Sequence, residues 1–258
     1  MHNKRIFGML LQKSKFRIGV LATVVGCFLL LSPLAQVTAE SMANNVPGAV
    51  SEGGLEKWVP RAEAGEVFAM YVVGYMYSNG ENAPRDVAKG LEWHYRAAER
   101  GYAPSKLAIA NMYLDGDGVA KDRAKALAWY ERAAKTGYVR AQANLAAIYL
   151  GNEQFEPDYA RSFYWFRQAA AQGDDQSRYN LGLMHSSGWG VPKRDYVAAY
   201  ALLVPLGERG HEQALTALSQ LRGLLSEADY SLALNLAERW RDDENLIVML
   251  EQYAALSR

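Results

Sequence analysis

Apolar residues recur every three to four positions along most of the chain, in segments separated by short runs of glycine and polar residues. In one clear segment, residues 103–114, the apolar positions with helical spacing are Leu107, Ile109, Ala110, Met112 and Tyr113. The Asp-Gly-Asp-Gly run at 115–118 breaks this helix. A second helix is predicted to begin near Asp122, a suitable N-cap, and to end before Gly137, where a positive φ is expected. This segment therefore predicts a helix–turn–helix unit.

The same unit recurs with a nearly fixed period. Its closing glycines are spaced 36, 36, 36 and 37 residues apart, and they are Gly65, Gly101, Gly137, Gly173 and Gly210. Trp93, Trp129 and Trp165 repeat at intervals of 36 residues. A period of this length is typical of proteins in which each unit buries its apolar face only against its neighbours. The sequence therefore predicts an all-α solenoid of helix–turn–helix repeats with a 36-residue period.

The repeats divide the chain into segments of different kinds. Residues 66–210 hold four repeats, and residues 55–65 are interpreted as an N-terminal capping helix. Residues 211–258 are predicted to form a degenerate fifth repeat and a C-terminal capping helix, because a terminal unit must present one face to water. Residues 40–54 are small, polar and rich in glycine, which predicts a flexible leader.

The first 39 residues have the features of an export signal. Five basic residues and no acidic one precede an apolar run at 18–31, and the small-residue pattern Val37-Thr38-Ala39 follows. These features predict a signal peptide cleaved after Ala39 and a periplasmic protein. The apolar run is shorter than the ~20 residues that span a membrane. An uncleaved N-terminal anchor and a lipoprotein modified at Cys27 stay open as alternatives.

Charge and cysteine content narrow the classes of partner. The whole chain is neutral, but residues 40–258 hold 23 basic and 28 acidic side chains, a net charge of −5. Nucleic-acid-binding proteins usually carry a basic stripe, so no nucleic-acid partner is expected. Cys27 is the sole cysteine. The exported chain would therefore be stabilised by helix packing rather than by disulfides.

Comparison of the repeats with one another identifies positions that are kept for structural reasons. The first helix keeps a small residue at Ala69, Ser105, Ala141 and Ser177. Near its end lies what we call the aromatic position, occupied by Tyr77, Tyr113, Tyr149 and His185. The second helix is preceded by a capping aspartate at Asp86, Asp122, Asp158 and Asp195. Small residues allow close helix approach, and the aromatic residues are expected to fill the groove between repeats.

Other positions of the first helix vary freely from one repeat to the next. Residues four and seven positions apart share a face, and the inner helices of a solenoid line the concave surface on which partners usually bind. Trp189 has no counterpart in the other repeats, and in its glycine-flanked loop it is interpreted either as an exposed contact residue or as packed over its own repeat. The predicted partner-binding residues are Phe68, Val72, Tyr75, Asn111, Arg140, Asn144, Gln176, Asn180 and Trp189.

Residues that could catalyse a reaction are few. His94, His185 and His211 are far apart in the sequence. Other repeats hold different residues at these positions, namely Tyr130, Tyr149 and Asp174. Packing or surface roles are therefore expected for the histidines, and no catalytic, metal or cofactor site is predicted. The repeated tryptophans are interpreted as packing residues, with a sugar-binding platform as the alternative.

A resemblance to the Sel1-like repeat, a subclass of the tetratricopeptide-type α-solenoids, is carried by the run L-A-I-A-N-M-Y-L-D-G-D-G-V-A-K-D-R-A-K-A-L-A-W-Y-E-R-A-A-K-T-G at 107–137. It extends over residues 55–222. The fourth repeat departs from it, with one extra loop residue, Leu202 in place of the tryptophan and Pro205 inside the second helix, where a kink is expected.

The resemblance implies a right-handed superhelix of helix pairs that acts as an adaptor in protein complexes. Bacterial members resembling this chain are mostly exported, with roles in envelope polysaccharide assembly, signalling and flagellar motors. The expected function is therefore a periplasmic scaffold for a protein or peptide partner of the cell envelope, not an enzyme. A component of a polysaccharide or flagellar-motor complex is the alternative, and a polysaccharide or a membrane protein stays open as the partner.

Overall fold

The computed structural model describes residues 53–152, 155–241 and 246–256. The expected signal peptide, including Cys27 and Ala39, and the leader up to residue 52 lie outside the described residues.

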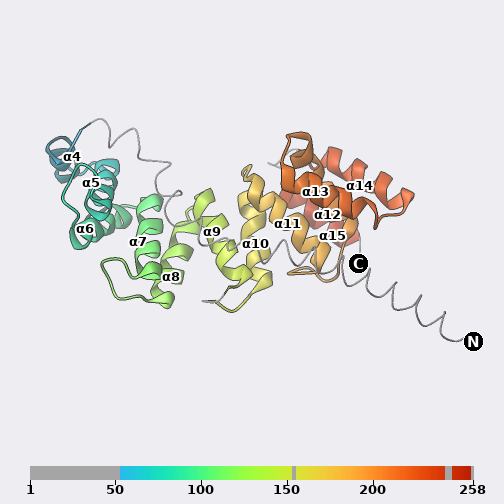
Figure 1. Ribbon diagram of the computed structural model, residues 1–258, viewed down its shortest axis with the longest axis horizontal. Helices are drawn as coiled ribbons and strands as arrows, with labels where there is room; N and C mark the ends of the chain where they lie inside the picture. The colour runs from blue at the N-terminus through green and yellow to red at the C-terminus, as the bar shows by residue number, and fades with distance from the viewer. Residues whose placement is uncertain (1–52, 153–154, 242–245, 257–258) are drawn as a thin grey trace, which may run out of the picture.

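The described residues form twelve α-helices, labelled α4 to α15, and one isolated β-bridge between Asn152 and Phe155. α4 (Leu55–Glu63) precedes five helix pairs, and α15 (Leu246–Leu256) follows them. The pairs are α5 (Val67–Asn79) with α6 (Val87–Glu99), α7 (Ala103–Asp115) with α8 (Arg123–Ala134), α9 (Val139–Leu150) with α10 (Tyr159–Ala170), α11 (Asp175–Ser187) with α12 (Tyr196–Glu208), and α13 (Glu212–Arg222) with α14 (Glu227–Arg239). Successive pairs lie side by side in an elongated array, with α4 and α14 at opposite ends (Figure 1). The predicted all-α solenoid is confirmed.

Aspartate begins the second helix of each of the first four repeats. The carboxylates of Asp86, Asp122, Asp158 and Asp195 accept from the backbone N–H three residues on, at 3.1, 2.9, 3.0 and 2.9 Å. Each carboxylate thereby satisfies an N–H that has no partner within the helix. The N–H groups of the same aspartates donate, over 2.7–2.9 Å, to the carbonyls of the aromatic position, that is of Tyr77, Tyr113, Tyr149 and His185. These two bonds close the loop in the same way in all four repeats.

Small residues let the first helix of each repeat pack closely on its neighbours. The small position is fully buried in all four repeats, at Ala69, Ser105, Ala141 and Ser177. At Gly74, a Cβ atom would lie 2.9 Å from the ring of His94, so glycine allows α5 and α6 to approach. In the second, third and fourth repeats, the first helix packs against its own second helix and against the second helix of the preceding repeat.

The C-terminal end departs from this order of stacking. α14 packs against α12, and α15 returns to contact α10 of the third repeat. Leu246 and Leu250 of α15 are buried in a hydrophobic cluster that also contains Leu202. Upstream, α12 is uninterrupted to Glu208 although Pro205 lies inside it. The last helix therefore packs back over the third and fourth repeats instead of extending the array.

None of the helices in the described part of the chain is both long and apolar enough to cross a membrane.

Candidate protein-binding surface

Four of the nine predicted contact residues are buried. Val72 has no exposed surface, and Asn111, Asn144 and Tyr75 are 4%, 7% and 7% exposed. The cause is that neighbouring helices enclose the first helix of each repeat, so that residues 69–76 of α5 and 144–149 of α9 have no solvent-facing side. The prediction that these four residues lie on an open concave face is therefore wrong.

The polar atoms of two of these residues bond within the molecule. The hydroxyl of Tyr75 donates to Glu81 at 3.0 Å, and the side-chain oxygen of Asn111 accepts from the hydroxyl of Tyr130. Burial, together with the bond to Glu81, raises the pKa of Tyr75 to about 12. The adjacent cavity of about 50 Å³ is also lined by His94. Ligand sites usually measure ~300–1,000 Å³, so these groups stabilise packing between the first two repeats.

Four other predicted residues keep accessible surface: Phe68, Arg140, Gln176 and Asn180. Phe68 packs edge-on against Trp58, with the ring centroids 6.0 Å apart. Gln176 donates to the side-chain oxygen of Asn180 at 3.5 Å on α11. These residues are distributed over α5, α9 and α11, and their part in partner binding stays a prediction.

Trp189 is partly buried and packs on the preceding repeat rather than over its own, and its part in partner binding stays a prediction. Its ring stacks on Tyr159, with the centroids 5.0 Å apart and the planes 9° from parallel. The next residue, Gly190, lies so close to α10 that a Cβ atom there would be 2.3 Å from the Tyr159 carbonyl oxygen. The loop is therefore held against the preceding repeat, and one face of the indole is covered.

The repeated tryptophans pack as predicted. Trp93, Trp129 and Trp165 each lie against a hydrophobic cluster. The guanidinium of Arg96 lies 3.8 Å from the centroid of Trp93, and that of Arg132 lies 4.6 Å from Trp129. Such contacts add a cation–π attraction to the packing.

The histidines also have structural surroundings. His94 and His185 are buried, and the Nδ1 atom of His211 accepts from the N–H of Ala214 at 3.2 Å, which caps α13. Asp174, at the equivalent position of the fourth repeat, caps α11 in the same way. Within the described ranges, no three or more potential metal-ligating side chains come together.

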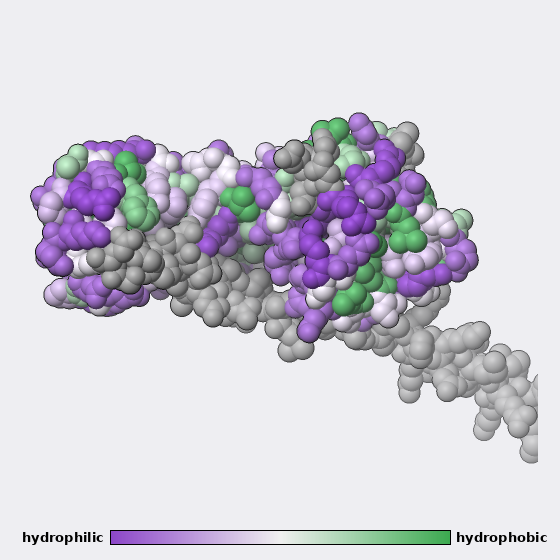
Figure 2. Space-filling view, turned by 90° about the horizontal axis from the view of Figure 1, so that it is seen from above, coloured by the Kyte–Doolittle hydropathy of each residue, from purple (hydrophilic) through white to green (hydrophobic). Residues whose placement is uncertain are grey.

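A surface that the sequence reasoning missed lies in the last repeat. It consists of exposed leucines on α13, on α14 and between them; we call this set the C-terminal leucine surface, and its members are Leu215, Leu224, Leu232 and Leu234. They are 40–49% exposed, and they are four of the six large hydrophobic side chains found exposed in the described residues. Figure 2 shows hydrophobic colour gathered at this end of the molecule. The signal in the sequence is the run Leu232-Ala233-Leu234, which places leucines on both sides of the buried Ala233.

A family model and a solved structure agree with this architecture. The family model for the Sel1 repeat matches residues 67–102, 103–138, 139–174, 175–211 and 213–243. Among solved structures, a Sel1 repeat protein from Oxalobacter formigenes is 32% identical, with a TM-score of 0.57, over 64% of this chain and 47% of that chain. Another is c5321, a protective antigen present in uropathogenic Escherichia coli strains that displays an SLR fold. It is 26% identical, with a TM-score of 0.42, over 75% of this chain and 50% of that chain.

The chain thus matches about half the length of these two solved structures. Comparison with curated proteins gives no match. The five family matches cover more than half of this chain, and the last lies within the segment predicted as a degenerate fifth repeat. Repeats of this kind typically mediate protein–protein interactions. The sequence period, the helix pairs and these matches together show that the chain belongs to the Sel1 repeat family.

Proposed function

We propose that this protein is an exported, non-catalytic adaptor that binds a protein partner of the cell envelope. The basic and apolar N-terminal sequence supports export. The Sel1 repeats support a role in protein–protein interaction. The one feature of the surface that carries the proposal is the C-terminal leucine surface.

The exposed leucines of the last repeat favour a protein-binding surface. Terminal repeats of solenoids usually present a polar outer face that keeps the array soluble. Here the last repeat instead leaves Leu215 and Leu224 each 49% exposed. Several exposed large apolar side chains within one repeat favour an interaction site, since covering them removes apolar area from water. A partner could make further contacts with the accessible residues Arg140, Gln176 and Asn180.

The partner can be captured by crosslinking in intact cells, followed by purification of the tagged protein and mass spectrometry. A variant carrying Leu232→Ser and Leu234→Ser should recover at least about ten-fold less partner, a loss equivalent to ~1.4 kcal/mol. Tyr164→Ser is the matched control, because Tyr164 is 47% exposed on α10, outside this surface. Circular dichroism should show unchanged helix content in both variants.

A second variant tests the accessible polar residues, by combining Arg140→Ala, Gln176→Ala and Asn180→Ala. Full recovery of the partner by both the leucine variant and this variant would refute the proposed surfaces. Recovery of polysaccharide-assembly or flagellar-motor proteins would place the adaptor in one of those complexes. Fractionation tests export separately, since a chain confined to the cytoplasm would contradict it.

A further inference from the structure

The junction between the third and fourth repeats differs from the two junctions that precede it. In the second and third repeats, the tyrosine at the aromatic position lies within hydrogen-bonding distance of a polar residue on the second helix of the preceding repeat. The hydroxyl of Tyr113 lies 2.8 Å from that of Tyr95, and the hydroxyl of Tyr149 donates to Glu131 at 2.7 Å. His185 takes the same position in the fourth repeat, as the loop hydrogen bonds of the fold show. Its side chain is shorter and has no hydroxyl.

The equivalent hydrogen bond is missing at the junction between the third and fourth repeats. Arg167 lies 36 residues after Glu131, at the same helix position, but its guanidinium pairs with Glu251 of α15 at 3.0 Å. The His185 ring meets Phe163 edge-on, with the centroids 5.4 Å apart. His185 is only 8% exposed, yet both ring nitrogens lack a hydrogen-bond partner. Buried polar atoms without partners are rare, and each calls for an explanation such as an absent ligand.

A cation is missing at the same place. In the first three repeats, Lys89, Lys125 and Arg161 lie 5.6, 5.3 and 5.3 Å from the ring centroid at the aromatic position. Each also pairs with the capping aspartate of its own helix. In the fourth repeat this position, three residues after the cap, is Ala198. The fourth repeat therefore lacks both the tyrosine and the long side chain that covers it.

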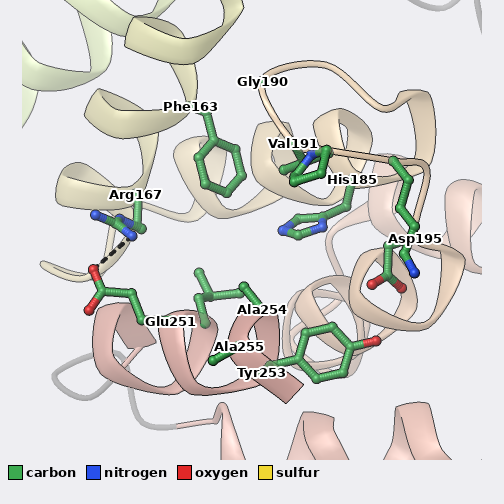
Figure 3. Close-up of a pocket in the computed structure, with 13 residues that line it drawn as sticks. Phe163, Arg167, His185, Gly190, Val191, Asp195, Glu251, Tyr253, Ala254 and Ala255 are labelled. Atoms are coloured by element: carbon green, nitrogen blue, oxygen red, sulfur yellow. Dashed lines mark ion pairs between the residues drawn. The ribbon is translucent and has the colours of Figure 1, made fainter. Parts of the chain in front are cut away.

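A pocket of about 640 Å³ lies beside His185. It lies between α10, the loop that joins α11 to α12, and α15 (Figure 3). Phe163 and Ala254 face each other across it, His185 points into it, and the pair of Arg167 with Glu251 closes one side (Figure 3). The volume falls within the ~300–1,000 Å³ of small-molecule sites, which are usually apolar with a few polar groups.

We propose that this pocket binds a small hydroxyaryl molecule, that is, an aromatic ring carrying a hydroxyl group. The ring would lie beside His185, against Phe163 and the alanines of α15, and would supply the hydroxyl that the tyrosines carry in the other repeats. The hydroxyl would bond to the His185 ring. Arg167 and Glu251 neutralise each other, and the other two charged lining residues, Lys193 and Asp195, are of opposite sign, so the walls favour an uncharged ligand.

The protonation of His185 suits this role. Burial lowers the pKa of its imidazole to about 4, although the carboxylate of Asp195 acts in the opposite direction. The ring is therefore neutral at pH 7 and offers one N–H donor and one acceptor nitrogen. A hydroxyl can use either of them. The site lies at the junction of the third and fourth repeats, so it is separate from the C-terminal leucine surface and does not depend on the adaptor role.

Titration calorimetry of the purified chain with p-cresol, and with toluene as the probe that lacks the hydroxyl, tests the proposal. We expect p-cresol to bind at least about five-fold more tightly, because a net hydrogen bond contributes ~1 kcal/mol. His185→Tyr should remove both ring nitrogens and extend a phenol into the pocket, where it competes with the ligand. It should weaken p-cresol binding at least about ten-fold without lowering the melting temperature.

His185→Phe keeps an aromatic ring but removes both nitrogens, so it should abolish the preference for p-cresol over toluene. If His185→Tyr does not fold, Ala254→Trp places an indole in the pocket from α15 and should give the same loss of binding. Absence of p-cresol binding to the unaltered chain would overturn the proposal. Equal affinities for p-cresol and toluene would overturn it as well, as would undiminished binding to a folded, filled variant.

Discussion

Buried histidines make the stability of this protein sensitive to acid. His94 is 2% exposed and its Nδ1 has no hydrogen-bond partner. Burial lowers its pKa to about 3, whereas histidine in an unfolded chain titrates near ~6.5. Between these values the unfolded chain binds a proton that the folded chain does not. The free energy of unfolding therefore decreases as the pH falls through this window.

We expect a change from pH 7 to pH 5 to lower the free energy of unfolding by about 2 kcal/mol through His94 alone. His94→Phe should remove most of this component, and the third repeat already holds Phe166 at this position. Urea unfolding of both proteins at the two pH values measures the difference. An equal pH dependence of the two proteins would show that His94 does not cause the acid sensitivity.

Single residues could be predicted from the sequence where their role is local. The capping aspartates and the positive φ of Gly137 depend only on the chain within a few residues, and both predictions are confirmed. Val72 shows where this reasoning fails. Its variation between repeats suggested a free surface, but a fully enclosed helix also tolerates variation when neighbouring side chains vary with it.

At the scale of the element, the loops within the repeats also hold neighbouring repeats together. Gly190 has a φ of 70°, and a Cβ atom there would lie 2.3 Å from the carbonyl oxygen of Tyr159 in the preceding repeat. Gly137 has a φ of 84°, but nothing lies within 4 Å of its added Cβ atom. Gly190 is therefore required both by its positive φ and by its close contact with Tyr159. Gly137 is required by its positive φ alone.

These two glycines make a matched pair for mutagenesis. Gly137→Ala should lower the free energy of unfolding by about 1 kcal/mol, the cost of a side chain in the left-handed region. Gly190→Ala should cost at least about 1–3 kcal/mol more, since relieving the overlap with Tyr159 shifts packed backbone. Chemical denaturation of both variants gives the comparison. Equal decreases in the free energy of unfolding would mean that the contact between Gly190 and α10 does not constrain the loop.

Elements were easier to predict than their contacts. The helices follow from apolar spacing, caps and glycines that lie in every repeat. The stacking of Trp189 on Tyr159 joins residues 30 positions apart, and no local pattern specifies it. The pocket beside His185 was also beyond prediction, because α15, which forms one of its walls, follows the last repeat and has no counterpart in the period.

At the scale of the whole molecule, the array is nearly one-dimensional. Each repeat contacts its neighbours, so a destabilising change should spread only a short distance along the chain. α15 is the exception, since it joins the C-terminus to α10 through Glu251 and through the cluster that contains Leu250. The third to fifth repeats should therefore unfold more cooperatively than the first two.

Leu250→Ala tests this coupling. Leu250 is 5% exposed, and truncating such a core leucine costs about 2–3 kcal/mol. Amide hydrogen exchange should accelerate in α10, α12 and α14, where the cluster lies, and stay unchanged in α5 to α8. Leu234→Ala, at a position 40% exposed, is the control and should change neither region. Faster exchange over the whole chain would mean that the repeats unfold as one unit. Acceleration confined to α15 would mean that this helix rests on the array without stabilising it, and the pocket against α10 would then lack a fixed wall.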